Sequence, residues 1–440
     1  MEFITNYRIE DYILGTKWED FPQAVKDRAV VCAIDLSTAL ILGVKGRQHE
    51  VGVNIAKQIY RPGDLHVIGS AEKLSFMGMV MALGHASNSF DIDDGCNALR
   101  GHPGTSFVGG VMAAALERDI TYREYLTALV VAYETTMRWG LAMQDFYKFM
   151  HSTGTYGAFG TAAGVGRIFG LSKETLNNAL SIADFHAPLV PVMRAVEYPS
   201  MNKDGVPFGT MAGALAVVEA MNGYEGKTHL LEMPEYQYLL DTLGTEYKIL
   251  DLYFKPYTCC RWAHQPISVS IRFMKENNFT WRDIKKVKVH TFKAAYLLSK
   301  IVPHTTDEAQ YNIAYPVASA LVNGDLGYMQ VRVEALDNPD VLDVMSRLEF
   351  VIDPDLEARF PAERLARVEF ELTDGRRLHT ETVAAPGEAS DNVGLEWITE
   401  KFKRITGVLI DSDRQKKILD TLTGDQNIPI RKVWDTIGTF

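Results

Sequence analysis

The stretch FGTMAGALAVVEAMN, residues 208–222, indicates how most of this chain folds. It has the length and spacing of a helix, and Gly223 follows where a glycine can end one. Small residues recur along one face of this helix: Gly209, Ala212, Gly213 and Ala216. Small side chains let helix backbones approach closely, so the pattern favours tight helix packing over a glycine-rich loop that binds a ligand.

Similar helical patterns fill the chain on the N-terminal side of this stretch, from about residue 20 to 225. Asp20 and Pro22 mark the start of a helix, and residues 25–42 have helical length and spacing. Thr121 and Glu124 form the signature of a capping box. These signals predict a large helical domain.

The pattern changes after residue 265. Residues 286–291 read as a strand, and residues 367–383 as two alternating strands joined by a type I′ turn at Asp374-Gly375. Residues 395–440 return to helical spacing. The sequence therefore predicts a mostly α protein with a smaller α+β domain. We place the helical domain at residues 1–256 and 393–440, and the α+β domain at 257–392.

Composition narrows the possible classes. The chain has 440 residues, 47% of them hydrophobic and 23% charged, with a net charge of −11, which excludes disordered, collagen-like and disulfide-scaffold chains. The acidic balance argues against nucleic acid or an anionic membrane as a partner. No apolar run reaches 18 residues and the N-terminus lacks a signal pattern, so we expect a cytoplasmic protein with no membrane span. The cysteines fit a reducing compartment: Cys32, Cys96, Cys259 and Cys260.

Motifs for nucleotides and metals are incomplete. Gly226-Lys227-Thr228 lacks the earlier glycine of a phosphate-binding loop, because Met221 stands there. Gly164-Val165-Gly166 misses the dinucleotide spacing, and the cysteines do not form a metal knuckle. We therefore expect neither a cofactor nor a metal.

The strongest candidate site is the segment NSFDIDDG, residues 88–95, with RGHPG at 100–104. Apolar side chains alternate with the acids, so some carboxylates should face inward. A buried carboxylate needs a cation or hydrogen-bond donors, and Arg100 and His102 are near in sequence. We expect functional roles for Asp91 and His102.

Four further segments carry candidate residues. His151 precedes a Ser/Thr cluster at a glycine-rich helix start that can meet an anion, although packing or capping explains this histidine equally well. Lys203, taken alone, reads as a surface lysine, and Tyr315, at the entry to a buried helix, as a core residue. Residues 254–264, at the junction of the two domains, hold a dense polar set: Lys255, Cys260, Arg261 and His264. His, Lys, Arg and Tyr without a metal or nucleotide motif suggest acid–base chemistry on an anionic substrate.

These five segments, in this order, resemble the MmgE/PrpD family, which includes 2-methylcitrate dehydratases, cis-aconitate decarboxylases and iminodisuccinate epimerase. The similar segments are residues 85–103, 151–163, 203–205, 255–264 and 310–324. The resemblance implies a helical domain with an α+β lid, a homodimer, a small carboxylate substrate and no cofactor.

The resemblance also implies roles for the candidate residues. A catalytic set is expected from Asp91, His102, His151, Lys203 and Tyr315. A substrate-binding set is expected from Arg100, Lys255, Cys260, Arg261 and His264. In this scheme His102 or His151 is the base, Asp91 orients His102, the lysines and Arg100 bind carboxylates, and Tyr315 donates a proton.

The chain differs from the family pattern at three places. Gly95 stands where a threonine is common, residues 96–99 differ, and Cys260 stands where some decarboxylases place a histidine. These differences argue against a cis-aconitate decarboxylase, and the RGHP segment is closer to that of the epimerase. The expected activity is that of a 2-methylcitrate dehydratase-like hydro-lyase. An epimerase, a cis-aconitate-type decarboxylase and a non-catalytic binding protein stay open as alternatives.

Overall fold

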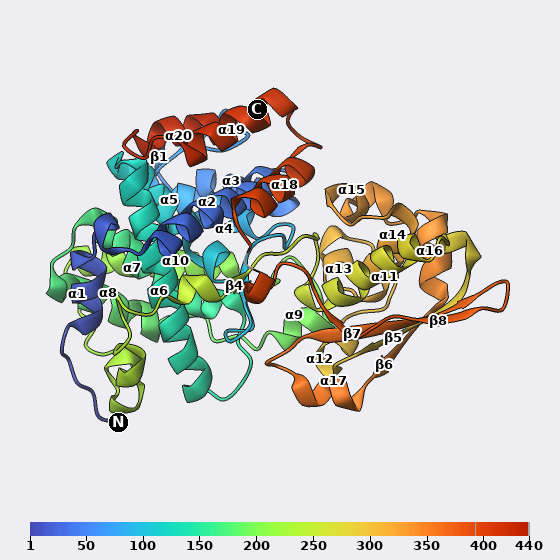
Figure 1. The fold of residues 1–440 in the computed structure, drawn as a ribbon. Helices are drawn as coiled ribbons and strands as arrows, with labels where there is room; N and C mark the ends of the chain where they lie inside the picture. Colours follow the sequence, from blue (N-terminus) through green and yellow to red (C-terminus); the bar gives the residue numbers. More distant parts are fainter. Residues whose placement is uncertain (392, 439–440) are drawn as a thin grey trace.

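The computed structural model describes residues 1–391 and 393–438, and these form two hydrophobic cores. In Figure 1 the helical body lies on the left, and a smaller part built on a sheet lies on the right. The fold is mostly helical with one small multistranded sheet, so the predicted fold class is confirmed.

The helical body is built from the N-terminal half of the chain. Its helices are α1 (Arg8–Gly15), α2 (Gln23–Gly43), α3 (Arg47–Ile59), α4 (Phe76–Ser87), α5 (Pro103–Arg118), α6 (Tyr122–Phe146), α7 (Thr153–Phe169), α8 (Lys173–Phe185), α9 (Met193–Glu197) and α10 (Val206–Met221). Two short antiparallel strand pairs accompany them: β1 (Pro62–His66) with β2 (Lys73–Leu74), and β3 (Gly95–Cys96) with β4 (Leu252–Tyr253). The predicted capping box is confirmed, because Thr121 accepts from the Glu124 amide at the start of α6.

The small residues of α7 and α10 bring these helices into close contact. A Cβ added at Gly209 would stand 1.9 Å from the Gly154 carbonyl oxygen, and one at Gly213 would stand 2.1 Å from that of Ala158. Neither position has room for a side chain. The prediction of tight packing between small-residue helices is confirmed.

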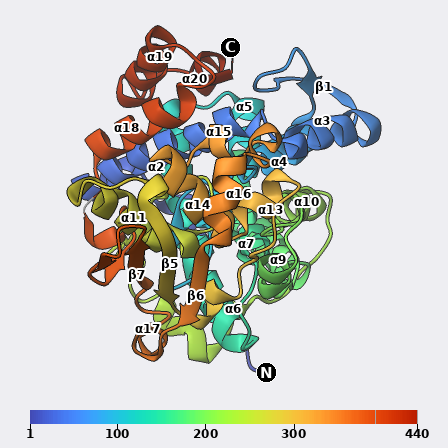
Figure 2. The same ribbon diagram turned by 90° about the vertical axis from the view of Figure 1, so that its right-hand side faces the viewer.

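The sheet-bearing part follows, with helices packed on the sheet. Its elements are α11 (His264–Glu276), β5 (Ile284–Thr291), α12 (Lys293–Tyr296), α13 (Thr306–Gln310), α14 (Ala314–Asn323), α15 (Tyr328–Val331), α16 (Pro339–Ser346), β6 (Leu348–Ile352), α17 (Pro354–Arg359), β7 (Leu365–Leu372), β8 (Arg377–His379) and β9 (Val383–Ala384). The strand order is β6-β5-β7-β8, with β5 parallel to β6 and antiparallel to β7, and β9 also pairs with β7. Figure 2 shows β7, β5 and β6 side by side below α14 and α16.

The β7–β8 hairpin forms as predicted, but its turn differs. Gly375 has φ of +90°, whereas Asp374 does not have a positive φ. A type I′ turn needs positive φ at both central residues, so that prediction is wrong. The strands end at Leu372 and resume at Arg377, which leaves a longer connection.

The chain then returns to the helical body through α18 (Leu395–Thr406), α19 (Ser412–Thr423) and α20 (Ile430–Gly438). α18 packs on α2, where a buried ion pair joins Lys401 to Asp35. Residue 392, at the predicted boundary, and residues 439–440 lie outside the described residues. We keep the division at 256/257 and 392/393 as a proposal. The core of the sheet-bearing part also includes side chains from the predicted helical domain, such as Phe90, Ile92 and Val196.

Among the described helices, no single one has both the length and the apolar composition needed to cross a membrane. The pair α2 and α3, bent by 82° at their junction, passes that test together. Most of α2 is buried in the core of the helical body.

Short 3-10 helices connect the larger elements. They are η1 (Trp18–Asp20), η2 (Leu230–Glu232), η3 (Pro234–Leu239), η4 (Lys248–Asp251), η5 (Arg261–Ala263), η6 (Trp281–Asp283), η7 (Val333–Ala335) and η8 (Ala389–Asp391).

Candidate active site

The β3–β4 strand pair brings residues 88–95, here called the acidic loop, against the junction of the two parts. Gly95 pairs with Tyr253, and Cys96 with Leu252. The acids therefore lie just before one strand and Lys255 just after the other. A Cβ at Gly95 would stand 2.2 Å from Cζ of Tyr253, so the closeness of the two strands requires glycine at this position.

A fully buried ion pair forms across this strand pair. The Lys255 Nζ donates to Asp91 Oδ1 at 2.6 Å and lies 3.6 Å from Asp93 Oδ1. Asp91 has φ of +50°, an uncommon backbone conformation for aspartate. The second carboxylate oxygen of Asp91, like that of Asp93, is buried without a hydrogen-bond partner among the described residues. No donor of the described residues therefore fills these two acceptors, although Asp93 Oδ2 lies 3.5 Å from His102 Nδ1.

His102 stands at the start of α5 and points its ring into the acids. Its Nδ1 lies 2.9 Å from the Asp94 carbonyl oxygen. Because a carbonyl only accepts, Nδ1 carries the proton, and Nε2 of the neutral ring keeps its lone pair. That Nε2 lies 3.8 Å from Asp91 Oδ1 and 3.9 Å from Asp204 Oδ2. The ring is therefore oriented for proton transfer at Nε2, between two carboxylates.

Asp204 completes the site from the start of α10. Its carboxylate is buried and accepts a hydrogen bond from the Tyr311 hydroxyl. Tyr311 follows α13 in the sheet-bearing part, so this bond joins the two parts of the molecule at the site.

The two carboxylates beside His102 have pKa values shifted in opposite directions. Burial alone would raise the pKa of Asp91, but the Lys255 ammonium, followed by His102, holds it below its ordinary value. Burial raises the pKa of Asp204, and the Asp91 carboxylate adds to that rise. Environments that move the pKa values of two neighbouring carboxyl groups apart are typical of sites where one group acts as an acid and the other stays ionised.

His151 is buried, and both of its ring nitrogens have no partner among the described residues. Burial lowers its pKa to about 4, so the ring is neutral at pH 7. It packs against Phe149, with ring centroids 3.7 Å apart. Two residues further on, Thr153 Oγ1 accepts from the His102 amide at 3.2 Å. The start of α7 therefore lies against His102, which agrees with a place for His151 beside the site.

Lys203 lies at the site, but its ammonium is occupied. Nζ donates to the carbonyl oxygens of Asn88 and Ser89 and to Oε1 of Gln310, and it lies 3.2 Å from Asp307 Oδ1. An ammonium has three donors, so none is left for a substrate. In this structure Lys203 fixes the backbone of the acidic loop against α13.

The remaining predicted residues lie around the cluster or away from it. Cys260 is close, since its amide donates to the Gln310 carbonyl, and burial raises its thiol pKa to about 12. The Arg261 guanidinium is bound to Pro386, Ala385 and Glu388. His264 lies 2.9 Å from the Cys259 carbonyl oxygen, inside the sheet-bearing part. The Arg100 side chain lies near Arg364. Burial lowers the pKa of Arg100, and the positive charge of Arg364 lowers it further.

Tyr315 has its hydroxyl away from the cluster. The hydroxyl donates to the carbonyl oxygens of Gln330 and Ala335 at 2.8 and 3.0 Å. Four residues earlier, Tyr311 occupies the place beside the acids that we expected Tyr315 to hold. The structure therefore places Tyr311 of this motif beside the acids and Tyr315 away from them.

The same cluster has donor atoms that a cation could share. Ligand atoms of Asp91, His102 and Asp204 all lie within 4.8 Å of one another. The Lys255 ammonium, 2.6 Å from Asp91, already supplies positive charge at this place, and an ion would have to share Asp91 with it. The expectation of a site without metal or cofactor stays a prediction.

Comparison with known proteins confirms the family resemblance. The MmgE/PrpD N-terminal domain matches residues 7–247, and the MmgE/PrpD C-terminal domain matches residues 257–424. A cis-aconitate decarboxylase of Aspergillus terreus (strain NIH 2624 / FGSC A1156) is 23% identical over 439 residues, covering 91% of this chain and 89% of that protein. The human cis-aconitate decarboxylase is 22% identical over 370 residues, covering 76% and 74%. With both domains matched along most of its length, this chain belongs to the MmgE/PrpD family.

Proposed function

We propose that this protein is a lyase that acts on a small di- or tricarboxylate by acid–base catalysis, without a cofactor. The observation that carries the proposal is the placement of His102 Nε2 between Asp91 and Asp204, with the Lys255 ammonium beside them. Membership of the family and the decarboxylase activity of its relatives agree with a lyase.

In the proposed reaction His102 is the base. Its Nε2 takes a proton from the carbon next to a substrate carboxylate, and the Asp91 carboxylate stabilises the charge that the ring acquires. Lys255 stabilises the enediolate charge that develops on the substrate, and its ammonium has donors left for this task.

The proton for the leaving group comes from Asp204. Its raised pKa lets it hold a proton, and the hydrogen bond to Tyr311 positions it. A base and a separate acid on one site are what an elimination of water needs. We therefore favour a 2-methylcitrate dehydratase-like hydro-lyase.

Two other reactions remain candidates on the same site. Epimerisation begins with the same proton abstraction and returns the proton to the opposite face of the carbon. His151, neutral and without a partner among the described residues, is the second group it would use. Decarboxylation of a cis-aconitate-like acid needs only a proton donor, and the decarboxylase activity of the relatives supports it.

The first test is proton NMR of the protein with a panel of di- and tricarboxylates in D2O. We expect one acid to incorporate deuterium and to convert to a product that has lost water. A product with an inverted centre would identify an epimerase, and loss of carbon dioxide a decarboxylase. If acids of the panel bind but neither incorporate deuterium nor convert to a product, the result would contradict the proposal and favour a binding protein.

Support for the binding-protein alternative would come from Gly95 and the altered loop after it, where the chain departs from the family pattern. Gly95 has a packing reason in the structure, because Tyr253 fills the space that a side chain would need.

A homodimer is also part of the proposal, and sedimentation analysis of the purified chain checks it.

A further inference from the structure

A cavity opens on the surface beside the candidate active site. It has a volume of about 550 Å³ and lies between α9, with the segments on either side of it, and the first turn of α10. Pockets of this size are typical of small-molecule sites. Tyr198 and Phe208 line it and are 78% and 63% exposed, so aromatic faces are available to the carbon skeleton of a ligand.

The charge of this cavity differs from that of the whole protein. The chain carries a net charge of −11, yet the residues that line the cavity include Arg194 and Lys203 and no acid. A cavity with one sign of charge attracts ligands of the other sign. The ligand that fits is an anion.

Arg194 supplies the free charge. The Lys203 ammonium is held by protein acceptors in the acidic loop and α13. The Arg194 guanidinium is exposed and has no hydrogen bond, ion pair or ring contact with any residue that the structure describes. A guanidinium offers paired donors that match the two oxygens of a carboxylate.

The cavity also adjoins the reacting groups. Lys203 and Gly205 line it, and Asp204, between them, turns its carboxylate toward His102. A molecule that reaches from Arg194 past Gly205 would bring its far end toward the proposed acid and base.

We propose that Arg194 binds the remote carboxylate of the substrate, the one distant from the carbon that His102 deprotonates. This inference rests on the proposed function and deepens it. It assigns the cavity as the subsite that selects di- and tricarboxylates over monocarboxylates.

The test compares binding of citrate, tricarballylate and acetate by calorimetry at fixed, low salt. The proteins are the wild type, Arg194→Gln, Arg194→Lys and Arg61→Gln. Arg61 is exposed and outside the cavity, so its variant removes the same charge elsewhere. We expect Arg194→Gln to weaken binding of the polycarboxylates roughly 10- to 100-fold, the effect of one charged hydrogen-bonded contact. Arg194→Lys should recover part of that affinity, while Arg61→Gln should match the wild type.

Three outcomes overturn the inference. Arg194→Gln could bind citrate and tricarballylate as tightly as the wild type while the wild type still exchanges deuterium; the inference then fails and the proposed function stands. Equal weakening in Arg61→Gln would show a general charge effect with no subsite. A wild-type protein that binds no acid and exchanges none would end both proposals.

Discussion

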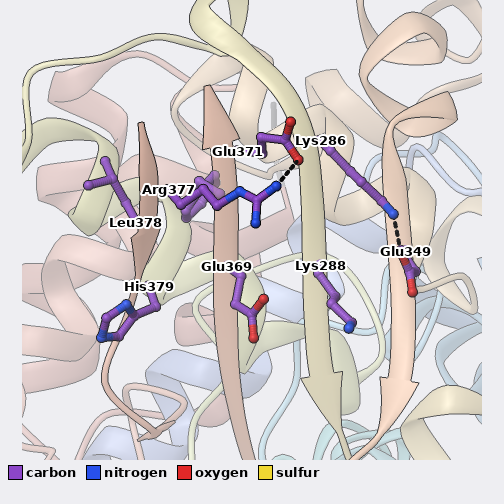
Figure 3. Close-up of a pocket in the computed structure, with 9 residues that line it drawn as sticks. Lys286, Lys288, Glu349, Glu369, Glu371, Arg377, Leu378 and His379 are labelled. Atoms are coloured by element: carbon purple, nitrogen blue, oxygen red, sulfur yellow. Dashed lines mark ion pairs between the residues drawn. The ribbon is translucent and has the colours of Figure 1, made fainter. Parts of the chain in front are cut away.

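Two regions of this molecule are rich in charge, and they are built in opposite ways. One is the outer face of the sheet, where Lys286 pairs with Glu349 and Arg377 reaches Glu371 (Figure 3). The strand register sets Lys288 opposite Glu349 on one side and Glu369 on the other. The other region is the Asp91–His102–Lys255 cluster, which is buried.

On the sheet, opposite charges face each other across strands and water reaches them. The Lys286 and Glu349 side chains are 53% and 42% exposed. In the buried cluster, acids outnumber cations and two carboxylate oxygens lack partners among the described residues. On the sheet, pairing of opposite charges in water accounts for the charged side chains without a ligand. Burial without pairing makes the buried cluster the place where a ligand is expected.

The largest effect should come from removing the buried cation. Lys255→Met leaves Asp91 and Asp93 without their counter-charge, and breaking a buried pair costs about 3–5 kcal/mol. Urea unfolding measures this loss in the free energy of unfolding. A loss below about 1 kcal/mol, the range of exposed pairs, would remove the distinction between the two regions.

The next effect concerns pH and Asp94, which lies in the same acidic loop. Burial, followed by the nearby Asp35, raises the pKa of Asp94 from 3.8 to about 7. The folded protein therefore keeps a proton that the unfolded chain loses as pH rises from about 4 to 7. The stability that this proton contributes is complete below pH 4 and is lost as pH rises through 7.

Asp94→Asn removes this dependence. The difference in unfolding free energy between wild type and variant should fall with rising pH, by up to about 1.4 kcal/mol per unit. Urea unfolding at pH 5, 6, 7 and 8 measures it. Parallel pH profiles for the two proteins would be the contrary result.

A smaller effect should follow from filling the space at Gly95. Gly95→Ala places a methyl group against the Tyr253 ring, and overpacking of this kind costs about 1–3 kcal/mol. Gly15→Ala is the matched control, because no atom lies within 4 Å of its added Cβ. Thermal unfolding of both variants compares them. Equal stability would mean that the two strands can move apart.

The smallest effect is expected on the sheet face. Lys286→Met removes one half of an exposed pair, and a pair in water contributes little to the free energy of unfolding. The same urea titration used for Lys255→Met gives the value. A loss as large as that of Lys255→Met would show that exposure does not separate the two regions.

Much of the fold was predictable because its signals are local. The capping box at Thr121, the small-residue helix at 208–222 and the strand at 286–291 each depend on neighbouring residues, and each is present, with its ends shifted by up to two residues. The prediction of a type I′ turn was wrong because the loop between β7 and β8 has more residues than Asp374 and Gly375 alone.

The site was predictable in part. The acidic loop, His102 and Lys255 could be predicted because dense polar motifs mark them in the sequence, and the structure brings them together. Asp204 and Tyr311 were missed, although both lie inside the family-like motifs, because their meeting depends on how the two parts of the molecule pack.

The start of helix α14 lies between Tyr311 and Tyr315 and sends their side chains in different directions. Asn312 Oδ1 accepts from the amides of Ala314 and Tyr315, so α14 begins there. That start leaves Tyr311 facing Asp204 and turns Tyr315 toward Gln330. Spacing alone does not tell which of the two tyrosines faces the acids.

The most direct test of the central claim is the rate of deuterium incorporation into the carboxylate that the panel identifies, measured for His102→Gln and for His304→Gln. His304 is exposed, so its variant controls for the loss of a histidine. We predict a fall of about 10²- to 10⁴-fold for His102→Gln, the range for a general base, and wild-type exchange for His304→Gln. Full exchange in a folded His102→Gln protein would contradict the assignment of His102 as the base.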